Sequence, residues 1–398
     1  MVITTVLMVL ASLFIAASTA TSTLSLYFEI KFWRGLRTRG DALGGRGYPS
    51  VTVIMPVRGV DQYMEGNVKS VLEQDYPGMV NYLFIFDSME DPGYNVIKRL
   101  VNDKANVRIL VLNGGGGKSL ALSMGLRNVD TELVAFVDSD ALVPRDWLRN
   151  LVNELLSNSS YGASTTYRFY VPLSNYSLGS ILRSSFNMIG ITAMQNPVAR
   201  FTWGGSTVVW NWLIRKWNVP DYLPNYYSDD YVITHFVHKE GLKIAFVPKS
   251  MVITLEDTNL RGAFEWAVRQ LWFVRVYGFR GFLLYLASYT LLATTLPLGL
   301  ITALLTSTPW LALATLMPYI IGSIKDYYRV RSISGLSQFH QRYIGRRLPI
   351  YMGLASILNI YFSWIAILRT MTKRSITWRG RVFTEDGARA RMRDKPLP

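Results

Sequence analysis

Two pairs of aspartates combine residue types and spacings that could do chemistry. Asp138 and Asp140 enclose one serine and follow an apolar run in the stretch ELVAFVDSD. Where a strand ends, alternate residues can point to one side, and two hard carboxylate oxygens suit Mg²⁺ or Mn²⁺ holding a substrate diphosphate. A lone Asp-x-Asp is more often a simple turn or a helix N-cap. The apolar run in front of this pair favours the metal site.

The adjacent aspartates Asp229 and Asp230 are candidates for proton transfer. They lie in YYSDDYVITHFVHKEG, in front of a segment, 231–240, that we expect to be helical. A carboxylate beside a second carboxylate has its pKa raised by the neighbouring charge, which suits a general base. The other interpretation is an N-cap that starts the helix. Spacing alone leaves both interpretations open.

A glycine-rich stretch, NGGGGKSLALSMGL at 113–126, could hold a phosphate through Lys118. The P-loop of ATP- and GTP-binding proteins requires a glycine five residues before its Gly-Lys pair. That position is Leu112 here, so the strict P-loop motif fails. The stretch therefore needs a different context to explain its lysine.

The segments that would position these residues predict an α/β domain at 48–260. Short apolar runs rich in β-formers alternate with charged, leucine-rich stretches; the runs are 51–57, 82–87, 107–113 and 132–140. Strands buried on both faces and separated by helices indicate a mostly parallel sheet. Ligands of such sheets bind beyond the carboxyl ends of the strands, where Asp87 and the Asp138–Asp140 pair are expected.

Composition excludes several kinds of site. The chain has 398 residues, half of them hydrophobic, no cysteine, three histidines and a formal net charge of +15. Disulfides and thiolate or His-rich metal sites are therefore ruled out. The basic residues flank apolar runs, with six in 325–347 and nine in 369–398. This clustering indicates membrane topology rather than a nucleic-acid partner.

Three long uncharged runs predict an integral membrane protein. They cover 1–28, 281–324 and 348–368, and TSTPW at 306–310 divides the second into a helical hairpin. The expected organisation is an N-terminal transmembrane anchor at 1–30, the α/β domain at 48–260, an amphipathic interfacial helix at 261–280, transmembrane helices with a basic loop at 281–370 and a basic tail at 371–398.

The basic residues after the first run set the expected orientation; they are Lys31, Arg34, Arg37, Arg39 and Arg46. By the positive-inside rule they stay in the cytoplasm, so the α/β domain is expected to face the cytoplasm. The number of complete spans, and with it the side of the C-terminal tail, stays open.

The order of these pieces resembles the membrane-bound inverting glycosyltransferases with a GT-A fold, of the family 2/21 type. Within that group, MPVRGVDQYMEGNVKSVLEQDYPG (55–78) and EDPGYNVIKRL (90–100) look like segments of ceramide glucosyltransferases. The resemblance extends over about 51–281. It implies a Rossmann-like GT-A catalytic domain between N-terminal and C-terminal transmembrane helices.

The resemblance also implies roles in donor binding. Asp87, or Ser88 one residue on, falls where the family's first aspartate meets the uracil and ribose. Asp140 falls on the metal-binding position, with Asp138 beside it. Lys118 and its glycines match a stretch that lines the nucleotide-sugar site, which gives the lysine a role outside a P-loop.

For the reaction itself, Asp230 matches the family's base, with Asp229 beside it. The family's Gln/Arg-x-x-Arg-Trp motif is altered. In WAVRQLWFVR, Arg269 is retained, but Trp272 stands in the arginine column, leaving Arg275 or Arg280 to supply the charge that meets the diphosphate. An aromatic, basic interfacial helix is the alternative interpretation.

Two further stretches resemble family segments. WGGSTVVW at 203–210 looks like the acceptor loop, where small residues let the substrate approach the backbone, although a plain strand turn explains it equally well. ITWRGRVF at 376–383 resembles a Trp-Arg-Gly-Arg stretch that follows the last span in related enzymes.

The implied function is transfer of a sugar, glucose in particular, from a UDP-linked donor to the hydroxyl of a ceramide-like or other membrane lipid. The implied cofactor is Mn²⁺ or Mg²⁺, and the anomeric centre is inverted. The alternative is a processive polysaccharide synthase of the cellulose or hyaluronan synthase type. Such an enzyme needs a translocation channel of more helices and an intact Gln-x-x-Arg-Trp. A membrane scaffold or P-loop nucleotidase is a third reading, which Leu112 and the acidic residues disfavour.

Overall fold

The computed structural model describes residues 2–36, 47–112, 116–174 and 176–398. Expectations for Arg37, Arg39, Arg46 and the glycines at 114 and 115 lie outside these residues. The chain divides into two compact units. Unit 1 consists of Met1–Arg37, Ser174–Met188 and Asp257–Lys373; unit 2 consists of Thr38–Leu173, Ile189–Glu256 and Arg374–Pro398.

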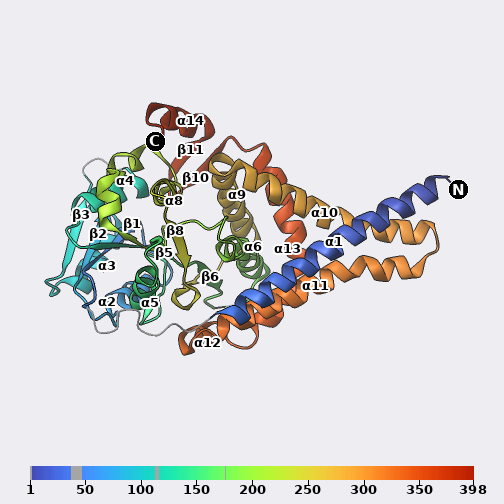
Figure 1. Cartoon of the computed structure of the whole chain (residues 1–398), viewed down its shortest axis with the longest axis horizontal. Coiled ribbons are helices and arrows are strands. Elements are labelled where there is room, and N and C mark those ends of the chain that lie inside the picture. The colour runs from blue at the N-terminus through green and yellow to red at the C-terminus, as the bar shows by residue number, and fades with distance from the viewer. Residues whose placement is uncertain (1, 37–46, 113–115, 175) are drawn as a thin grey trace. The chain divides into compact units, whose positions relative to one another are not determined.

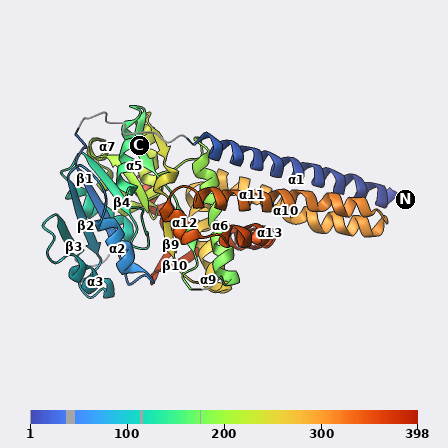
Figure 2. The ribbon, with the colours of Figure 1, turned by 90° about the horizontal axis from the view of Figure 1, so that it is seen from below.

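Unit 2 contains a seven-stranded sheet of order β3-β2-β1-β4-β7-β5-β8 (Figures 1 and 2). The strands are β1 Val51–Val57, β2 Val80–Phe86, β3 Val107–Val111, β4 Leu133–Val137, β5 Tyr161–Thr165, β7 Ser206–Trp210 and β8 Lys243–Phe246. β1 to β4 are parallel, and β7 alone runs antiparallel to both of its neighbours. The mostly parallel α/β sheet expected from the four apolar runs is confirmed.

Burial explains why these runs form central strands. All five residues of β4 are buried, and six of the seven residues of β1 are. β1 lies between β2 and β4. β2 and β3 are added on one side of β1 and β4 on the other, so the direction of strand addition reverses at β1. The carboxyl ends of neighbouring parallel strands meet at one edge, so the residues that follow β1, β2 and β4 are brought together.

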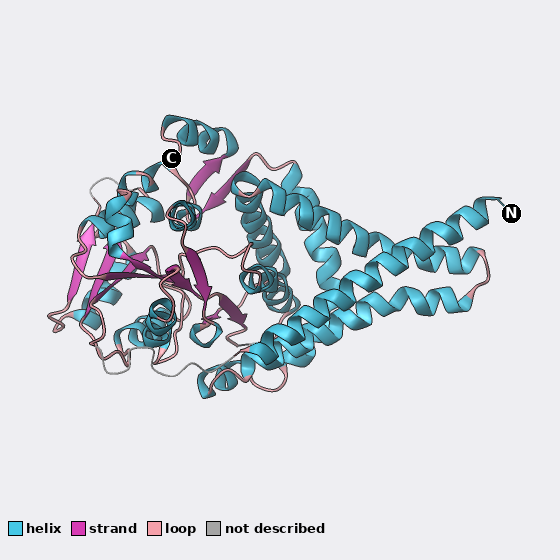
Figure 3. Ribbon diagram, in the orientation of Figure 1, coloured by secondary structure: helices cyan, strands magenta, loops and turns pink. Residues whose placement is uncertain are grey.

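Helices precede, separate and follow the strands of unit 2 along the chain (Figure 3). They are α2 Met64–Leu72, α3 Pro92–Val101, α4 Lys118–Arg127, α5 Trp147–Leu156, α7 Asn211–Lys216, α8 Asp229–Lys239 and α14 Glu385–Asp394. Local sequence fixes their ends: α3 begins with Pro92 after Asp91, whose carboxylate accepts the Gly93 N–H. Trp147 is buried in the core, and its indole N–H donates to Ser206 Oγ at 2.6 Å.

Two small sheets complete unit 2. β6 Arg168–Val171 pairs in parallel with β9 Val252–Leu255, and β10 Ser375–Trp378 pairs antiparallel with β11 Arg381–Thr384. The β10–β11 hairpin turns through Arg379 and Gly380, whose φ angles are 46° and 76°. A two-residue turn of this kind requires positive φ at both central residues. Glycine adopts this conformation readily, whereas it is energetically unfavourable for Arg379.

Unit 1 consists of helices; α6 Leu178–Gln195 begins in this unit and ends in unit 2. The others are α1 Val2–Gly35, α9 Leu260–Tyr277, α10 Phe279–Leu305, α11 Pro309–Ser334, α12 Gln338–Ile344 and α13 Leu348–Met371. α1, α10 and α13 are long and apolar enough to cross a membrane. These candidate spans indicate a membrane protein. The apolar run 281–324 is divided into α10 and α11 at 306–308, as the TSTPW break predicts.

A buried ion pair ties two helices of unit 1 together. Arg329 of α11 donates to both carboxylate oxygens of Glu29 of α1, and to the Met188 carbonyl at 2.9 Å. The Trp33 indole N–H also donates to Glu29, at 2.5 Å. A buried charge is tolerated when it is paired and hydrogen-bonded, as this one is.

Candidate active site

The aspartates after β4 converge on one cation. Arg168, the first residue of β6, contacts Asp138 Oδ2 through Nη2 and Asp140 Oδ2 through Nη1, both at 2.6 Å. Its guanidinium also lies 4.6 Å from the ring centroid of Trp203. The two carboxylates therefore do turn to one side. Arg168 could not be predicted from the sequence, because nothing in its local sequence distinguishes it from other arginines.

Lys118 joins the two pairs of aspartates. It is the first residue of α4, and its Nζ lies 2.9 Å from Asp138 Oδ1 and 3.2 Å from Asp229 Oδ2. Burial acts to lower the pKa of Lys118, but the charges of Asp138, Asp229 and Asp230 outweigh it and hold that pKa above its ordinary value. The lysine therefore stays protonated near neutral pH, among three carboxylates.

The adjacent aspartates form the first turn of α8. Ser228 is the N-cap, since its hydroxyl accepts the Tyr231 N–H, and the helix begins at Asp229. The interpretation of the aspartates as an N-cap of a helix at 231–240 is therefore wrong. Asp229 is buried, and Asp230 Oδ1 accepts the Gly204 N–H at 2.6 Å.

Asp230 has the pKa of a base that works near neutral pH. Burial first, and then the charge of Asp229, raise the pKa of Asp230 to about 7, although Lys118 and the Gly204 N–H act in the opposite direction. General bases are most effective when their pKa is close to the working pH. Asp230 is thus suited to accept a proton at neutral pH.

The Asp138–Asp140 pair keeps one carboxylate oxygen for a divalent cation of the expected kind, while Lys118 and Arg168 pair with the other three. Asp140 Oδ1 is buried without a hydrogen-bond partner among the described residues. Burial raises the pKa of Asp140, whereas Lys118 and Arg168 hold that of Asp138 below its ordinary value against the effect of burial. No group of three or more metal-binding side chains exists in the described parts of the chain. Two carboxylates alone suit Mg²⁺ or Mn²⁺, whose other ligands are substrate phosphates and water.

Asp87 follows β2 and is held by three groups. Asp87 Oδ2 contacts Arg58 Nη1 at 3.0 Å and Arg381 Nη2 at 2.9 Å, and its Oδ1 accepts the Gly117 N–H at 3.2 Å. The expected nucleoside-binding aspartate thus lies beside the glycine that precedes Lys118. Arg58 lies in the 55–78 motif, but no pattern in the sequence indicates that it contacts Asp87.

The three residues expected from the altered motif lie on α9, in unit 1. Trp272 is fully buried, and its indole N–H has no hydrogen-bond partner among the residues described. Arg275 donates to the carbonyls of Met371 and Lys373 at 2.9 and 2.7 Å. A role for Arg269, Trp272 or Arg275 in donor binding stays a prediction.

The glycines at 204 and 205 form a turn in front of β7, in which the Ser206 N–H donates to the Trp203 carbonyl. This turn is more than a plain connection, because Gly204 lies directly against the aspartates of α8. A Cβ at Gly204 would lie 1.9 Å from Asp229 Oδ2 and 2.8 Å from Asp230 Oδ1.

We therefore expect Gly204→Ala to displace both carboxylates and to lower kcat by about 10²-fold, the usual effect of misplacing a catalytic group by an ångström. Gly47→Ala is the control, because a Cβ there meets nothing within 4 Å. Steady-state kinetics and thermal unfolding of both variants test this. Wild-type kcat in folded Gly204→Ala would contradict the placement of these carboxylates in the reaction.

Comparison with known proteins decides the family. Residues 7–389 match the model of glycosyl transferase family 21. The chain belongs to glycosyl transferase family 21. The expected family resemblance is thereby confirmed, and the protein is a glycosyltransferase.

Its curated relatives are distant. An uncharacterized glycosyltransferase of Haemophilus influenzae is 25% identical over 121 residues, covering 30% of this chain and 48% of the relative. A ceramide glucosyltransferase of Gibberella zeae is 25% identical over 139 residues, covering 31% of this chain and 26% of the relative. In both cases the match spans less than half of the relative's length, so the expected closeness to ceramide glucosyltransferases stays a proposal.

A solved structure confirms the GT-A fold. The mannosyltransferase PcManGT of Pyrobaculum calidifontis, in complex with GDP-Man and Mn²⁺, matches 92% of this chain and 99% of its own with a TM-score of 0.51. The sequence identity is 16%, so this likeness concerns the fold alone.

Proposed function

We propose that this family 21 enzyme transfers glucose from UDP-glucose to a hydroxyl group of a membrane lipid of the ceramide type, with inversion of the anomeric centre. One observation carries the proposal. A carboxylate with a pKa of about 7, Asp230, lies in one cluster with Lys118 and the Asp138–Asp140 pair. The cluster combines a proton acceptor with groups suited to a diphosphate.

The chemistry is a single displacement. The lipid hydroxyl oxygen bonds to the anomeric carbon as the bond from that carbon to the diphosphate breaks, and UDP leaves with the electron pair. A lipid hydroxyl has a pKa far above neutral, so Asp230 takes its proton as the new bond forms. No covalent enzyme intermediate is formed, and an α-linked donor gives a β-linked product.

Mn²⁺ or Mg²⁺ is the proposed cofactor, held by Asp140 and Asp138. A divalent ion there would offset negative charge on the departing nucleotide. Two features support it: the unpartnered buried Asp140 Oδ1, and the Mn²⁺ bound by the mannosyltransferase with the same fold. Lys118 adds a second positive charge for the phosphates.

The membrane lipid acceptor is supported by the three candidate spans and by the ceramide glucosyltransferase among the relatives. We also propose that the catalytic domain faces the cytoplasm, because Lys31 and Arg34 end α1. A tag inserted within 40–47 should resist protease in sealed right-side-out vesicles. Cleavage of the tag in these vesicles would show that the catalytic domain faces the opposite side of the membrane.

Product analysis tests the function. Purified enzyme in proteoliposomes is given a panel of UDP- and GDP-sugars with ceramide or diacylglycerol, and the extracted lipids are analysed by thin-layer chromatography and mass spectrometry. We expect a β-glucosylated ceramide and one UDP released per lipid. A long polymer as product would favour the processive synthase. A glycosylated diacylglycerol, or transfer of another sugar, would show that the proposed acceptor or donor is wrong.

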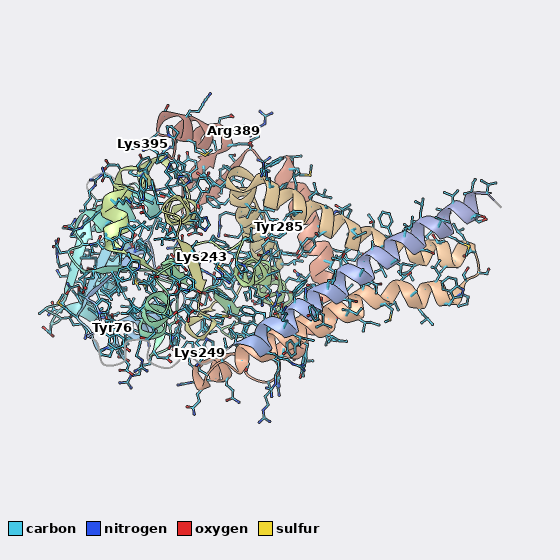
Figure 4. All side chains as sticks on the ribbon, in the orientation of Figure 1. Tyr76, Lys243, Lys249, Tyr285, Arg389 and Lys395 are labelled. Atoms are coloured by element: carbon cyan, nitrogen blue, oxygen red, sulfur yellow. The ribbon has the colours of Figure 1, made fainter. Side chains whose placement is uncertain are left out.

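Lys118→Ala tests the proposed phosphate contact. A charged hydrogen bond is worth about 1.5–3 kcal/mol, so the affinity for UDP should fall about 10- to 100-fold. Lys243→Ala is the control, because Lys243 is exposed (Figure 4). Isothermal titration measures both variants, with ATP as competitor. Tight ATP binding with hydrolysis by the wild type would instead revive the P-loop nucleotidase.

A further inference from the structure

The C-terminal segment after α13 is part of unit 2 (Figures 1 and 4). Several contacts dock it beside α8: the Tyr226 hydroxyl donates to the Lys395 carbonyl at 3.0 Å, Arg391 donates to the Pro224 carbonyl at 2.8 Å, and the Phe383 ring lies edge-on to Tyr227 at 4.9 Å. The β10–β11 hairpin is therefore anchored on the catalytic domain.

The turn of this hairpin reaches the Asp138–Asp140 segment. Arg379 Nη2 lies 2.7 Å from Asp61 Oδ1, and Asp61 Oδ2 accepts the Ser139 hydroxyl at 2.6 Å. Ser139 is the residue between the two candidate metal ligands. Arg379 is thus linked to them through Asp61 and Ser139, and its positive φ shows a turn conformation that arginine does not favour.

The first residue of β11 reaches the glycine turn in front of Lys118. Arg381 Nη2 contacts Asp87, which also accepts the Gly117 N–H. A Cβ at Gly117 would lie 2.6 Å from Arg381 Nη1. This guanidinium therefore lies directly against the backbone that leads into α4.

The two arginines have donors left for a ligand. Arg58, Arg379 and Arg381 are ion-paired with two carboxylates, those of Asp61 and Asp87. A guanidinium has five N–H donors, and toward the described residues Arg379 and Arg381 each use one. Their side chains are 33% and 29% exposed, so a ligand can reach them.

We propose that Arg379 and Arg381 bind the diphosphate of the nucleotide-sugar donor, so that the C-terminal hairpin completes the donor site. Arginine forks match phosphate oxygens in paired hydrogen bonds. The hairpin would thereby supply two cations to the donor site from within unit 2. This inference rests on the proposed function, since it assumes a nucleoside diphosphate donor.

The test compares ligands that differ only in their phosphates. Full-length Arg379→Gln, Arg381→Gln and the double variant are titrated with UDP, UMP and uridine, and with the guanosine series. We expect the affinity for UDP to fall about 10-fold in each single variant and about 100-fold in the double variant, as for lost charged hydrogen bonds. The affinity for UMP should fall less, and that for uridine should not change. Arg389→Gln, on the same segment and paired with Glu385, should match the wild type.

Contradictory outcomes separate the two ideas. A double variant that binds UDP as the wild type does, or that loses affinity for UDP and uridine equally, would overturn the inference and assign the arginines to anchoring the hairpin. Both results leave the proposed function standing. A wild type that binds neither UDP nor GDP would overturn the proposed function together with the inference. Thermal unfolding of each variant shows that the compared proteins are folded.

Discussion

Asp230→Asn is expected to lower kcat by about 10²–10⁴-fold, the usual contribution of a positioned general base. Asparagine keeps the shape and the hydrogen bond from Gly204 but cannot accept the proton of the acceptor hydroxyl. Titration should show unchanged UDP affinity, and single-turnover kinetics should place the loss in the chemical step.

The matched control is Asp229→Asn, which should lose less. Asp229 Oδ2 lies 3.2 Å from Lys118 Nζ, so we assign this carboxylate to pairing with the lysine. A larger loss for Asp229→Asn than for Asp230→Asn, or an α-linked product from an α-linked donor, would show that the base is misassigned.

The pH profile follows from the same group. A base acts in its deprotonated form, so kcat/KM should rise with pH and level off above about 7, the pKa of Asp230. The residual activity of Asp230→Asn should lack this rise. A wild-type profile that is flat between pH 5 and 8 would show that Asp230 is not the catalytic base.

Metal removal is expected to have the second large effect. If Asp138 and Asp140 hold a divalent ion against the diphosphate, chelation should abolish turnover and Mn²⁺ or Mg²⁺ should restore it. Asp140→Ala should remove the restoration and weaken Mn²⁺ binding in the presence of UDP, measured by electron paramagnetic resonance. Asp130→Ala, at a side chain that is 99% exposed, is the control.

Full activity of Asp140→Ala in metal-free buffer would end the metal hypothesis. Arg168 would then be the cation at this position, since its guanidinium already bridges both carboxylates in the structure. Arg168→Gln should in that case lose the activity that chelation spares. The two variants together therefore decide which cation serves the diphosphate.

The elements of the fold and the residue types of the site can be derived from local patterns in the sequence. Five apolar residues in a row, as in β4, can be satisfied only by a strand covered on both faces, so the parallel sheet was predictable. Uncharged runs long enough to cross a bilayer likewise predicted α1, α10 and α13, because length and hydropathy are local properties of the chain. Because parallel strands end at one edge, Asp87, Asp138 and Asp140 could be placed together from their positions in the chain.

The surroundings of those residues depend on contacts between distant parts of the chain. Arg379 and Asp61 are 318 positions apart, and Arg168 and Asp138 are 30 apart, so no local pattern indicates that they meet. The pKa of Asp230 likewise depends on burial, on the adjacent Asp229, on Lys118 and on the Gly204 N–H, which three separate segments bring together. Electrostatic effects depend on distance and solvent exclusion in space, and neither is encoded in the spacing along the chain.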